Sequence, residues 1–222
     1  MLLSASTEWR AACQFYPDAK RQASPLGGWF SYDIPVSGQQ LPVIFFHGGS
    51  GKVAAAASTQ YVIDRWAPDY LVNLGSCGGI DGLVAIDTVL LINRTIIYDI
   101  IEQMGDPVAA IERYSTDIDL TWLPEPFPIS VLPSPIVSAD RDLLAEEIPM
   151  LIEKYNAIAA DWESGSIAYV AAKNRMRVLI LRSVSDLVGL DGGEAYNDSE
   201  LWVRRATRQI HDLLSALPGF LQ

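Results

Sequence analysis

Short apolar runs alternate with amphipathic stretches along this chain, and the alternation predicts strands interleaved with helices. Residues 70–74 are apolar except for Asn73, and the segment 177–183, RVLILRS, has four apolar residues in a row; both runs are typical of central strands that are buried on both faces. Residues 29–36 instead alternate between apolar and polar positions, as a strand with one exposed face does. Residues 199–217 carry apolar side chains at helical spacing. This order predicts an α/β fold with a mostly parallel sheet and helices on both sides.

The remaining elements are predicted from shorter signals. Strands are expected at 1–5, 43–46, 88–93, 94–101 and near 129–132, and helices over 47–66, 142–155 and 164–174. Ser6 or Thr7 is expected to cap a helix that starts at Glu8, because a hydroxyl at that position accepts a free N–H of the first turn. Pro149 is expected to break or kink the helix in which it lies, since it lacks an N–H.

The first buried run ends in a glycine-rich segment, GSCGG, at residues 75–79. Three glycines in five positions predict a tight turn at positive φ that aims several N–H groups at an anion or a hydroxyl. Ligands in open α/β sheets bind beyond the carboxyl ends of such strands. The segment therefore marks a candidate binding site, although a strand-to-loop turn without any ligand has the same sequence pattern.

Composition and charge narrow the classes of partner. The 222 residues are 50% hydrophobic, which suits a single domain over 1–222 with a sizeable core. A count of 27 acidic against 16 basic residues gives a net charge of −11, and this field repels nucleic acid and anionic membranes. The two cysteines, Cys13 and Cys77, show no metal-ligand spacing. We therefore expect a reduced, cytoplasmic protein without a metal or cofactor.

A second glycine-rich segment, HGGSGKVAAAA at 47–57, invites comparison with nucleotide-binding loops. A phosphate-binding Walker A loop is excluded, because Val53 stands where a Ser or Thr should follow Lys52. The dinucleotide pattern G-x-G-x-x-A fits Gly49, Gly51 and Ala54, but the next strand does not end in the acid that would bind a ribose. The loop remains a candidate oxyanion or hydroxyl site at a helix N-terminus.

Carboxylates are expected to gather at the ends of the predicted strands. Glu8 follows the first strand, Asp186 follows the strand at 177–183, and Glu163 begins a helix beside the Ser76 turn. A partly buried carboxyl can keep or donate a proton near neutral pH, so the group suggests general acid chemistry on a neutral ligand. The alternative is structural, with Glu8 favouring the dipole of its helix and Asp186 capping a turn.

Five segments in order resemble one enzyme superfamily. They are GSGKVAAAA (49–57), PDYLVNLGSCGGI (68–80), SADRDL (138–143), ADWESGSIAYVA (160–171) and LRSVSD (181–186). Together they resemble the purine nucleoside phosphorylases and nucleosidases, and most closely the methylthioadenosine and S-adenosylhomocysteine nucleosidases. The resemblance covers nearly the whole chain. It implies a three-layer α/β/α fold with a mostly parallel, mixed central sheet, and cleavage of the bond between a ribose and a purine.

The resemblance also implies residue roles. Asp186 would protonate the purine with support from Ser185, and Glu163 would bind the ribose hydroxyls. Glu8 would orient the attacking water, with Ser76 and Arg182 lining its site. The remaining substrate-binding positions would be Gly78, Asp142, Leu143 and Trp162. The implied partner is a small purine nucleoside, bound by a homodimer.

Two positions depart from the resembled family. Asp142 stands where an apolar or aromatic residue usually stacks on the base, and Trp162 stands where a methionine usually lies under the ribose. An indole can still pack on a sugar face. The base and the 5′ substituent of the substrate are therefore left open by the sequence.

Four functions remain after this comparison. A hydrolytic nucleosidase is favoured, because Asn73 stands where the phosphorylases of the superfamily carry an arginine for phosphate. A phosphorylase would need Arg10, Lys52 or Arg182 to bind the phosphate. The other two candidates are a dinucleotide-binding oxidoreductase and a nucleoside-binding module without catalysis.

Overall fold

The computed structural model describes residues 1–196 and 198–222. The strands are β1 (Leu2–Leu3), β2 (Gln22–Ser24), β3 (Gly27–Val36), β4 (Gln39–His47), β5 (Tyr70–Ile80), β6 (Val89–Ile97), β7 (Ser115–Asp117), β8 (Leu132–Ser138), β9 (Ala159–Asp161), β10 (Arg177–Gly189) and β11 (Gly192–Gly193). The helices are α1 (Ser6–Phe15), α2 (Lys52–Trp66), α3 (Pro107–Glu112), α4 (Ile148–Tyr155), α5 (Ser164–Lys173) and α6 (Ser199–Phe220), with a 3₁₀ turn at Ala145–Glu147. No helix in the described ranges is both long and apolar enough to cross a membrane.

The sheet is mixed, as predicted, but it is not open. Parallel pairing joins β4, β1, β5 and β10 in one group and β6, β8 and β9 in another. The two groups meet in antiparallel pairs at both ends, β10 with β6 and β5 with β9. Strands β5, β10, β6, β8 and β9 thus close a ring, with the β1–β4 strands extending from β5. The prediction of a mostly parallel sheet holds only within each group.

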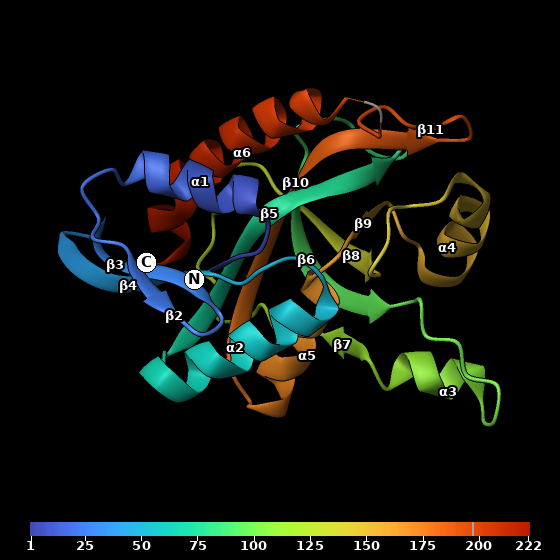
Figure 1. Ribbon diagram of the computed structural model, residues 1–222, viewed down its shortest axis with the longest axis horizontal. Coiled ribbons are helices and arrows are strands. Elements are labelled where there is room, and N and C mark those ends of the chain that lie inside the picture. The colour runs from blue at the N-terminus through green and yellow to red at the C-terminus, as the bar shows by residue number, and fades with distance from the viewer. Residues whose placement is uncertain (197) are drawn as a thin grey trace.

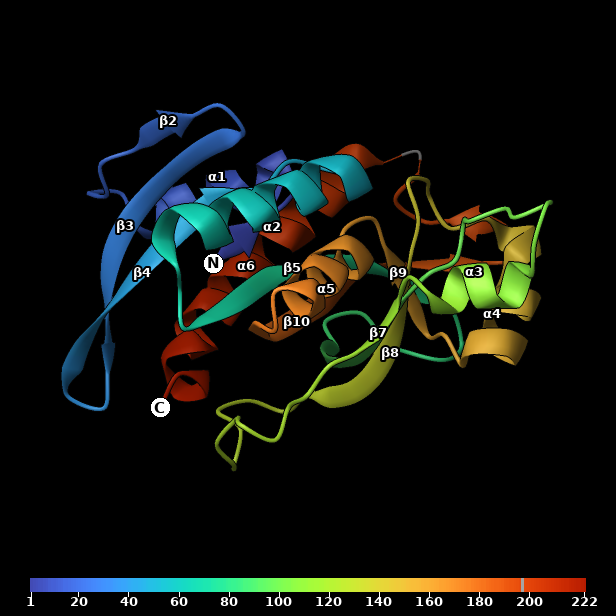
Figure 2. The ribbon, with the colours of Figure 1, turned by 90° about the horizontal axis from the view of Figure 1, so that it is seen from below.

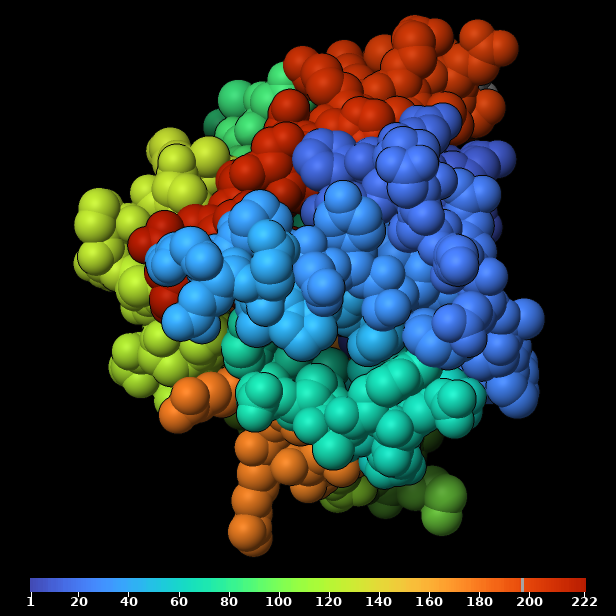
Figure 3. Space-filling model, turned by 90° about the vertical axis from the view of Figure 1, so that its left-hand side faces the viewer, coloured from blue at the N-terminus to red at the C-terminus, as the bar shows by residue number. Residues whose placement is uncertain are grey.

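Helices pack on two sides of this sheet (Figures 1 and 2). Helices α1 and α6 lie together over one side of β5 and β10, where Leu213 and Leu217 of α6 join a core with Leu3 of β1. Helices α2 and α5 pack together on the other side, where Val62 and Ile167 join a second core. In the view of Figure 3, the end of the β3–β4 hairpin lies between α2 and the C-terminal part of α6.

The glycine segment after the first buried run is a strand and not the predicted turn. Strand β5 runs through Gly75, Gly78 and Gly79, and none of the three has a positive φ. The absence of side chains makes room for neighbours instead. A Cβ on Gly75 would overlap the guanidinium of Arg182, and a Cβ on Gly79 would overlap the Val184 side chain. The predicted run at 177–183 likewise continues as β10 to Gly189, so Ser185 and Asp186 lie within a strand.

Several predicted boundaries are wrong for local reasons. Ala5, and neither Ser6 nor Thr7, is the N-cap of α1, and the Glu8 carboxylate accepts its N–H at 3.0 Å. Pro149 lies in the first turn of α4, where its missing N–H breaks no helical bond. The two strands expected at 88–93 and 94–101 are the single strand β6, and the strand expected near 129–132 is β8, beginning at 132.

Candidate functional site

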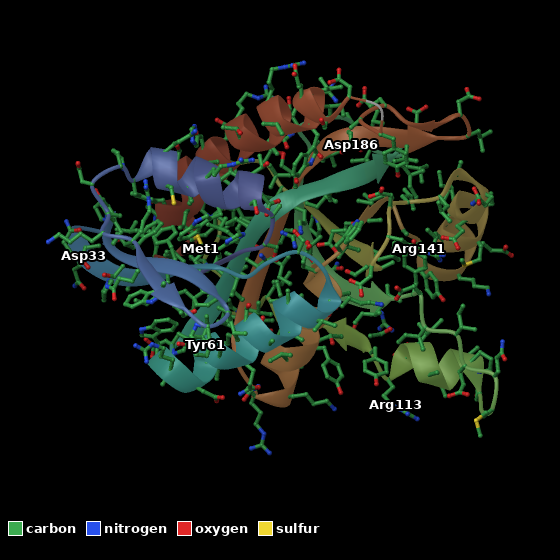
Figure 4. All side chains as sticks on the ribbon, in the orientation of Figure 1. Met1, Asp33, Tyr61, Arg113, Arg141 and Asp186 are labelled. Atoms are coloured by element: carbon green, nitrogen blue, oxygen red, sulfur yellow. The ribbon has the colours of Figure 1, made fainter. Side chains whose placement is uncertain are left out.

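A cavity of about 440 Å³ lies at the carboxyl ends of β5 and β10. Figure 4 shows Asp186 and Arg141 at this end of the sheet. The cavity is lined by nine of the residues predicted from the sequence, namely Glu8, Ser76, Gly78, Asp142, Leu143, Trp162, Glu163, Ser185 and Asp186. The fold thus brings together the first strand end, the glycine segment, the head of α5 and the bulged part of β10.

Glu8 is buried and held by three donors. Its Oε1 accepts the Ser76 N–H at 2.7 Å and the Ser76 hydroxyl at 3.1 Å, and its Oε2 accepts the Ala5 N–H at 3.0 Å. These contacts fix the carboxylate between the start of α1 and the glycine segment of β5. The N-terminal position on α1 also favours a negative charge there. Glu8 is therefore held in one orientation at the wall of the cavity.

Arg182, the predicted residue that does not line the cavity, lies buried against it. Its Nε donates to Asp161 Oδ2 at 2.7 Å and to Ser164 Oγ at 3.0 Å. Asp161 also accepts the Ser138 hydroxyl at 2.6 Å, so the ion pair is embedded in hydrogen bonds. The Nη2 group of Arg182 is buried and has no protein partner within 1–196 and 198–222. A buried donor of this kind is usually satisfied by an ordered water or a ligand.

Glu163 is held by the glycine loop before α2. The Gly51 N–H donates to Glu163 Oε1 at 2.9 Å. Burial, with a further contribution from the charge of Asp161, raises the pKa of Glu163 from 4.5 to about 8, against the opposing effect of Arg182. Any positive charge that develops in the cavity would therefore stabilise the ionised form of this carboxyl.

The glycine loop presents its amides to carboxylates of the protein. Gly49 and Gly51 have φ of +77° and +88°. Beside the Gly51 contact, the Lys52 N–H donates to Asp140 Oδ1 at 2.7 Å, and Lys52 Nζ donates to Asp99 at 2.5 and 2.6 Å. Carboxylates of the protein therefore occupy the N-terminus of α2. The amides of Gly51 and Lys52 are not available to the pyrophosphate of a dinucleotide.

Asp186 lies in a β-bulge of β10. The pairing register with β5 shifts between Val184 and Asp186, so Ser185 is the extra residue. The Ser185 hydroxyl donates to Asp186 Oδ1 at 2.6 Å. Burial raises the pKa of Asp186 above its ordinary value, although the Ser185 hydrogen bond opposes the shift and the charge of Glu194 adds to it. The bulge turns a strand residue into a candidate acid of the cavity.

Loop 139–143, after β8, forms another part of the wall. Leu143 is buried, and its carbonyl accepts the Tyr196 hydroxyl at 2.6 Å. Asp142 is exposed, and its charge contributes to raising the pKa of both Asp186 and Tyr196. Trp162 lies at the rim with 37% of its surface exposed. An acidic residue therefore faces the cavity where the resembled family carries an apolar one.

Sequence reasoning missed several lining residues. They are Ser50, Cys77, Arg141, Asp161, Tyr196, Ser199 and Trp202. Asp161 could have been predicted from the sequence, because it stands two residues before Glu163 in the segment ADWE. Tyr196 and Trp202 carried no such signal, since they come from the loop before α6 and from α6 itself.

The cations proposed for phosphate binding are engaged elsewhere. Arg10 donates to Thr7 and does not line the cavity, and Lys52 pairs with Asp99. Arg182 pairs with Asp161. Within the described part of the chain, Arg141 is the cationic side chain that lines the cavity, and it pairs with Glu147 at 2.6 Å. A phosphate dianion would find no cluster of free cations here.

The chain is similar to known proteins in sequence and in fold. A 5′-methylthioadenosine/S-adenosylhomocysteine nucleosidase of Geobacillus is 26% identical over 192 residues, which are 81% of this chain and 82% of that one. The nucleosidase of the same name from Helicobacter pylori, solved with butyl-thio-DADMe-Immucillin-A, has a TM-score of 0.79 at 16% identity over 99% of this chain and 95% of that one. A futalosine hydrolase mutant of Helicobacter pylori has a TM-score of 0.73 at 16% identity over 97% and 96%. The family model described as "Phosphorylase superfamily" matches residues 7–217, and the chain therefore belongs to the phosphorylase superfamily.

Proposed function

We propose that this protein is a nucleosidase that hydrolyses the N-glycosidic bond of an adenosine-type purine nucleoside. One observation carries the proposal: a single cavity holds Asp186, Glu8 and Glu163, each fixed by hydrogen bonds from a different part of the fold. Relatives and structural neighbours that bear the names of such nucleosidases support it.

The three carboxyl groups suit the three demands of the reaction. Asp186 donates a proton to the purine ring, which then leaves with the electron pair of the broken C1′–N bond as a neutral base. Glu8 accepts a proton from the water whose oxygen forms the new bond to C1′. Glu163 binds the ribose hydroxyls, and its ionised form favours the positive charge that develops on the sugar. Asp186 begins the cycle protonated, and its raised pKa supports that role.

The water is expected to lie between Glu8 and Arg182. Glu8 already accepts two bonds from Ser76, and Glu8 Oε1 and Arg182 Nη1 both lie beside Gly75, on the same side of β5. A water there would donate to the carboxylate and accept from the guanidinium. Such an arrangement orients an oxygen lone pair without any metal ion.

Phosphorolysis is the second candidate, and the cavity disfavours it. The guanidinium and ammonium groups near the site are paired with Asp161, Asp99 and Glu147. Asn73, at the position where related phosphorylases were expected to carry an arginine, is buried in β5 and donates to the Leu2 carbonyl at 3.0 Å. Hydrolysis needs no anion site and fits these contacts.

The test is base release from a panel of nucleosides, with and without millimolar phosphate. The panel contains adenosine, inosine, 5′-methylthioadenosine, S-adenosylhomocysteine and futalosine, because names of relatives and neighbours point to the last three. We expect free base and a free sugar at a rate that phosphate leaves unchanged. A ribose 1-phosphate product would establish the phosphorylase instead. Binding without turnover across the panel, in protein that unfolds cooperatively, would leave a binding module.

The finer structural assignments are part of the same proposal. Helices on two sides of the sheet support a three-layer α/β/α arrangement within one domain over 1–222. The unpaired, buried Cys13 and Cys77 fit a reducing cytoplasm. We further propose a homodimer, which light scattering of the purified protein would test.

A further inference from the structure

The bulge that carries Asp186 is held by helix α6. A bulge disrupts the regular strand-to-strand bonds, and here the Val184 carbonyl keeps one backbone donor, the Asp87 N–H at 2.9 Å, while side chains of α6 supply further donors. Arg205 Nη1 donates to the Ser185 carbonyl at 2.9 Å, and Gln209 Nε2 donates to the Val184 carbonyl at 2.8 Å. Arg205 and Gln209 lie one turn apart and so project from the same face of α6. The helix thus supplies side-chain donors to two successive carbonyls of the bulge.

A second side chain holds the other side of Asp186. Glu194 Oε1 accepts the Leu187 N–H at 3.1 Å, and the Glu194 N–H donates to the Leu187 carbonyl at 3.1 Å. The same Oε1 accepts a bond from Arg205 Nη1 at 2.7 Å. Arg205 is therefore hydrogen-bonded to the residue before Asp186, and Glu194 to the residue after it. An ion pair links Arg205 to Glu194.

We propose that Arg205 and Glu194 are positioning residues for Asp186, holding the bulge so that its carboxyl stays in the cavity. The proposal rests on the proposed function, in which Asp186 is the acid. It adds residues that do not line the cavity and that act through the backbone at Ser185 and Leu187.

The two residues also have opposite electrostatic effects on the acid. The Glu194 charge raises the pKa of Asp186 and the Arg205 charge lowers it. The other titratable groups that face Asp186 are Asp142 from the loop after β8, Cys77 on β5 and Tyr196 in the loop before α6. None of these three changes in the experiment below.

The experiment measures how turnover depends on pH in matched variants. Activity is expected to fall at alkaline pH as Asp186 loses its proton, and this fall is the alkaline limb of the pH profile. Arg205→Met removes the donor, so we expect turnover to fall on the order of tenfold. It also removes the positive charge, so the alkaline limb should move to higher pH. Glu194→Gln removes a negative charge, so the limb should move to lower pH. Each shift should be on the order of half a pH unit, as for one partly screened charge. Arg205→Lys keeps the charge, but its shorter side chain does not place a nitrogen where Nη1 meets both acceptors, so it should restore the wild-type position of the alkaline limb and only part of the turnover.

The same helix offers the controls. Arg204 and Glu200 are exposed and pair with each other at 3.8 Å, so Arg204→Met and Glu200→Gln make identical chemical changes away from the bulge. Both controls should leave turnover and the limb as in the wild type. Limbs that stay in place or move the same way in Arg205→Met and Glu194→Gln, or controls that match them, would overturn the proposal.

A second measurement separates this proposal from the proposed function. The Asp186 carboxyl is identified by carbon NMR as the signal lost in Asp186→Asn, and it is titrated in the same variants. The order of its pKa values should be Glu194→Gln lowest, wild type next and Arg205→Met highest. An inactive wild type with this order would refute the nucleosidase and keep the positioning residues. An active wild type without this order of pKa values would keep the nucleosidase and refute the positioning residues.

Discussion

Replacing Glu163 by glutamine should stabilise the folded chain at alkaline pH while it lowers activity. Burial and the neighbouring Asp161 raise the pKa of this carboxyl from 4.5 to about 8 in the folded chain. Between these two values the unfolded chain has released the proton and the folded chain still holds it. A rise in pH through this window therefore lowers the free energy of unfolding, and the loss is complete above about pH 8.

The size of the effect follows from the same two values. A change from 4.5 to about 8 corresponds to roughly 4–5 kcal/mol for a fully desolvated group. Glu163 is partly exposed and accepts the Gly51 N–H, so we expect about half of this, on the order of 2–3 kcal/mol. Glutamine carries no charge and keeps an oxygen for the Gly51 N–H. In a chain of this length the gain corresponds to a rise in Tm of roughly 5–10 °C at about pH 9.

The assay is urea and thermal unfolding of wild type and Glu163→Gln at about pH 5.5, 7 and 9. The stability gained by the variant should grow with pH, and its turnover should be low at each pH because the amide cannot favour a cationic sugar. Glu153→Gln on α4 is the matched control, since Glu153 is exposed and its replacement should have no pH-dependent effect. A gain that is independent of pH, or one shared by Glu153→Gln, would refute the reasoning. Unchanged turnover would remove Glu163 from the mechanism.

Three further predictions address the acid and the packing around the cavity. Asp186→Asn should lower turnover of a purine nucleoside on the order of 10²-fold and abolish the alkaline limb of activity, but spare a nitrophenyl riboside, whose leaving group needs no proton; equal losses on both substrates would make the residue structural. Gly75→Ala should destabilise the fold by about 1–3 kcal/mol in urea unfolding, because its Cβ overlaps the Arg182 guanidinium, and an unchanged midpoint would contradict this. Lys52→Met should raise KM several-fold by loosening the glycine loop, whereas Arg94→Met, which breaks an exposed ion network outside the cavity, should not; equal KM values would show that the Lys52 ion pair has no role.

The sequence by itself determined the central strands and most of the cavity. Apolar runs located the cores of β5 and β10, and the five resembling segments contain eight of the predicted lining residues, with Glu8 added from the end of the first predicted strand. This succeeded because an apolar side chain by itself indicates that its position is buried. It also succeeded because Glu163 and Asp186 stand at recognisable points of those segments, and Glu8 follows the first predicted strand.

The tertiary structure decided how these residues are held. Gly75 lies within β5, where Arg182 of the neighbouring strand fills the space that a Cβ would need, and the Gly51 amide donates to the carboxylate of Glu163. The ring closure that places β9 against β5, and the contact of Arg205 with the Ser185 carbonyl, join segments that are distant along the chain. Such contacts depend on strand register and helix packing. A local pattern of apolar and polar side chains carries no information about either, so only the folded chain shows which partner each group has.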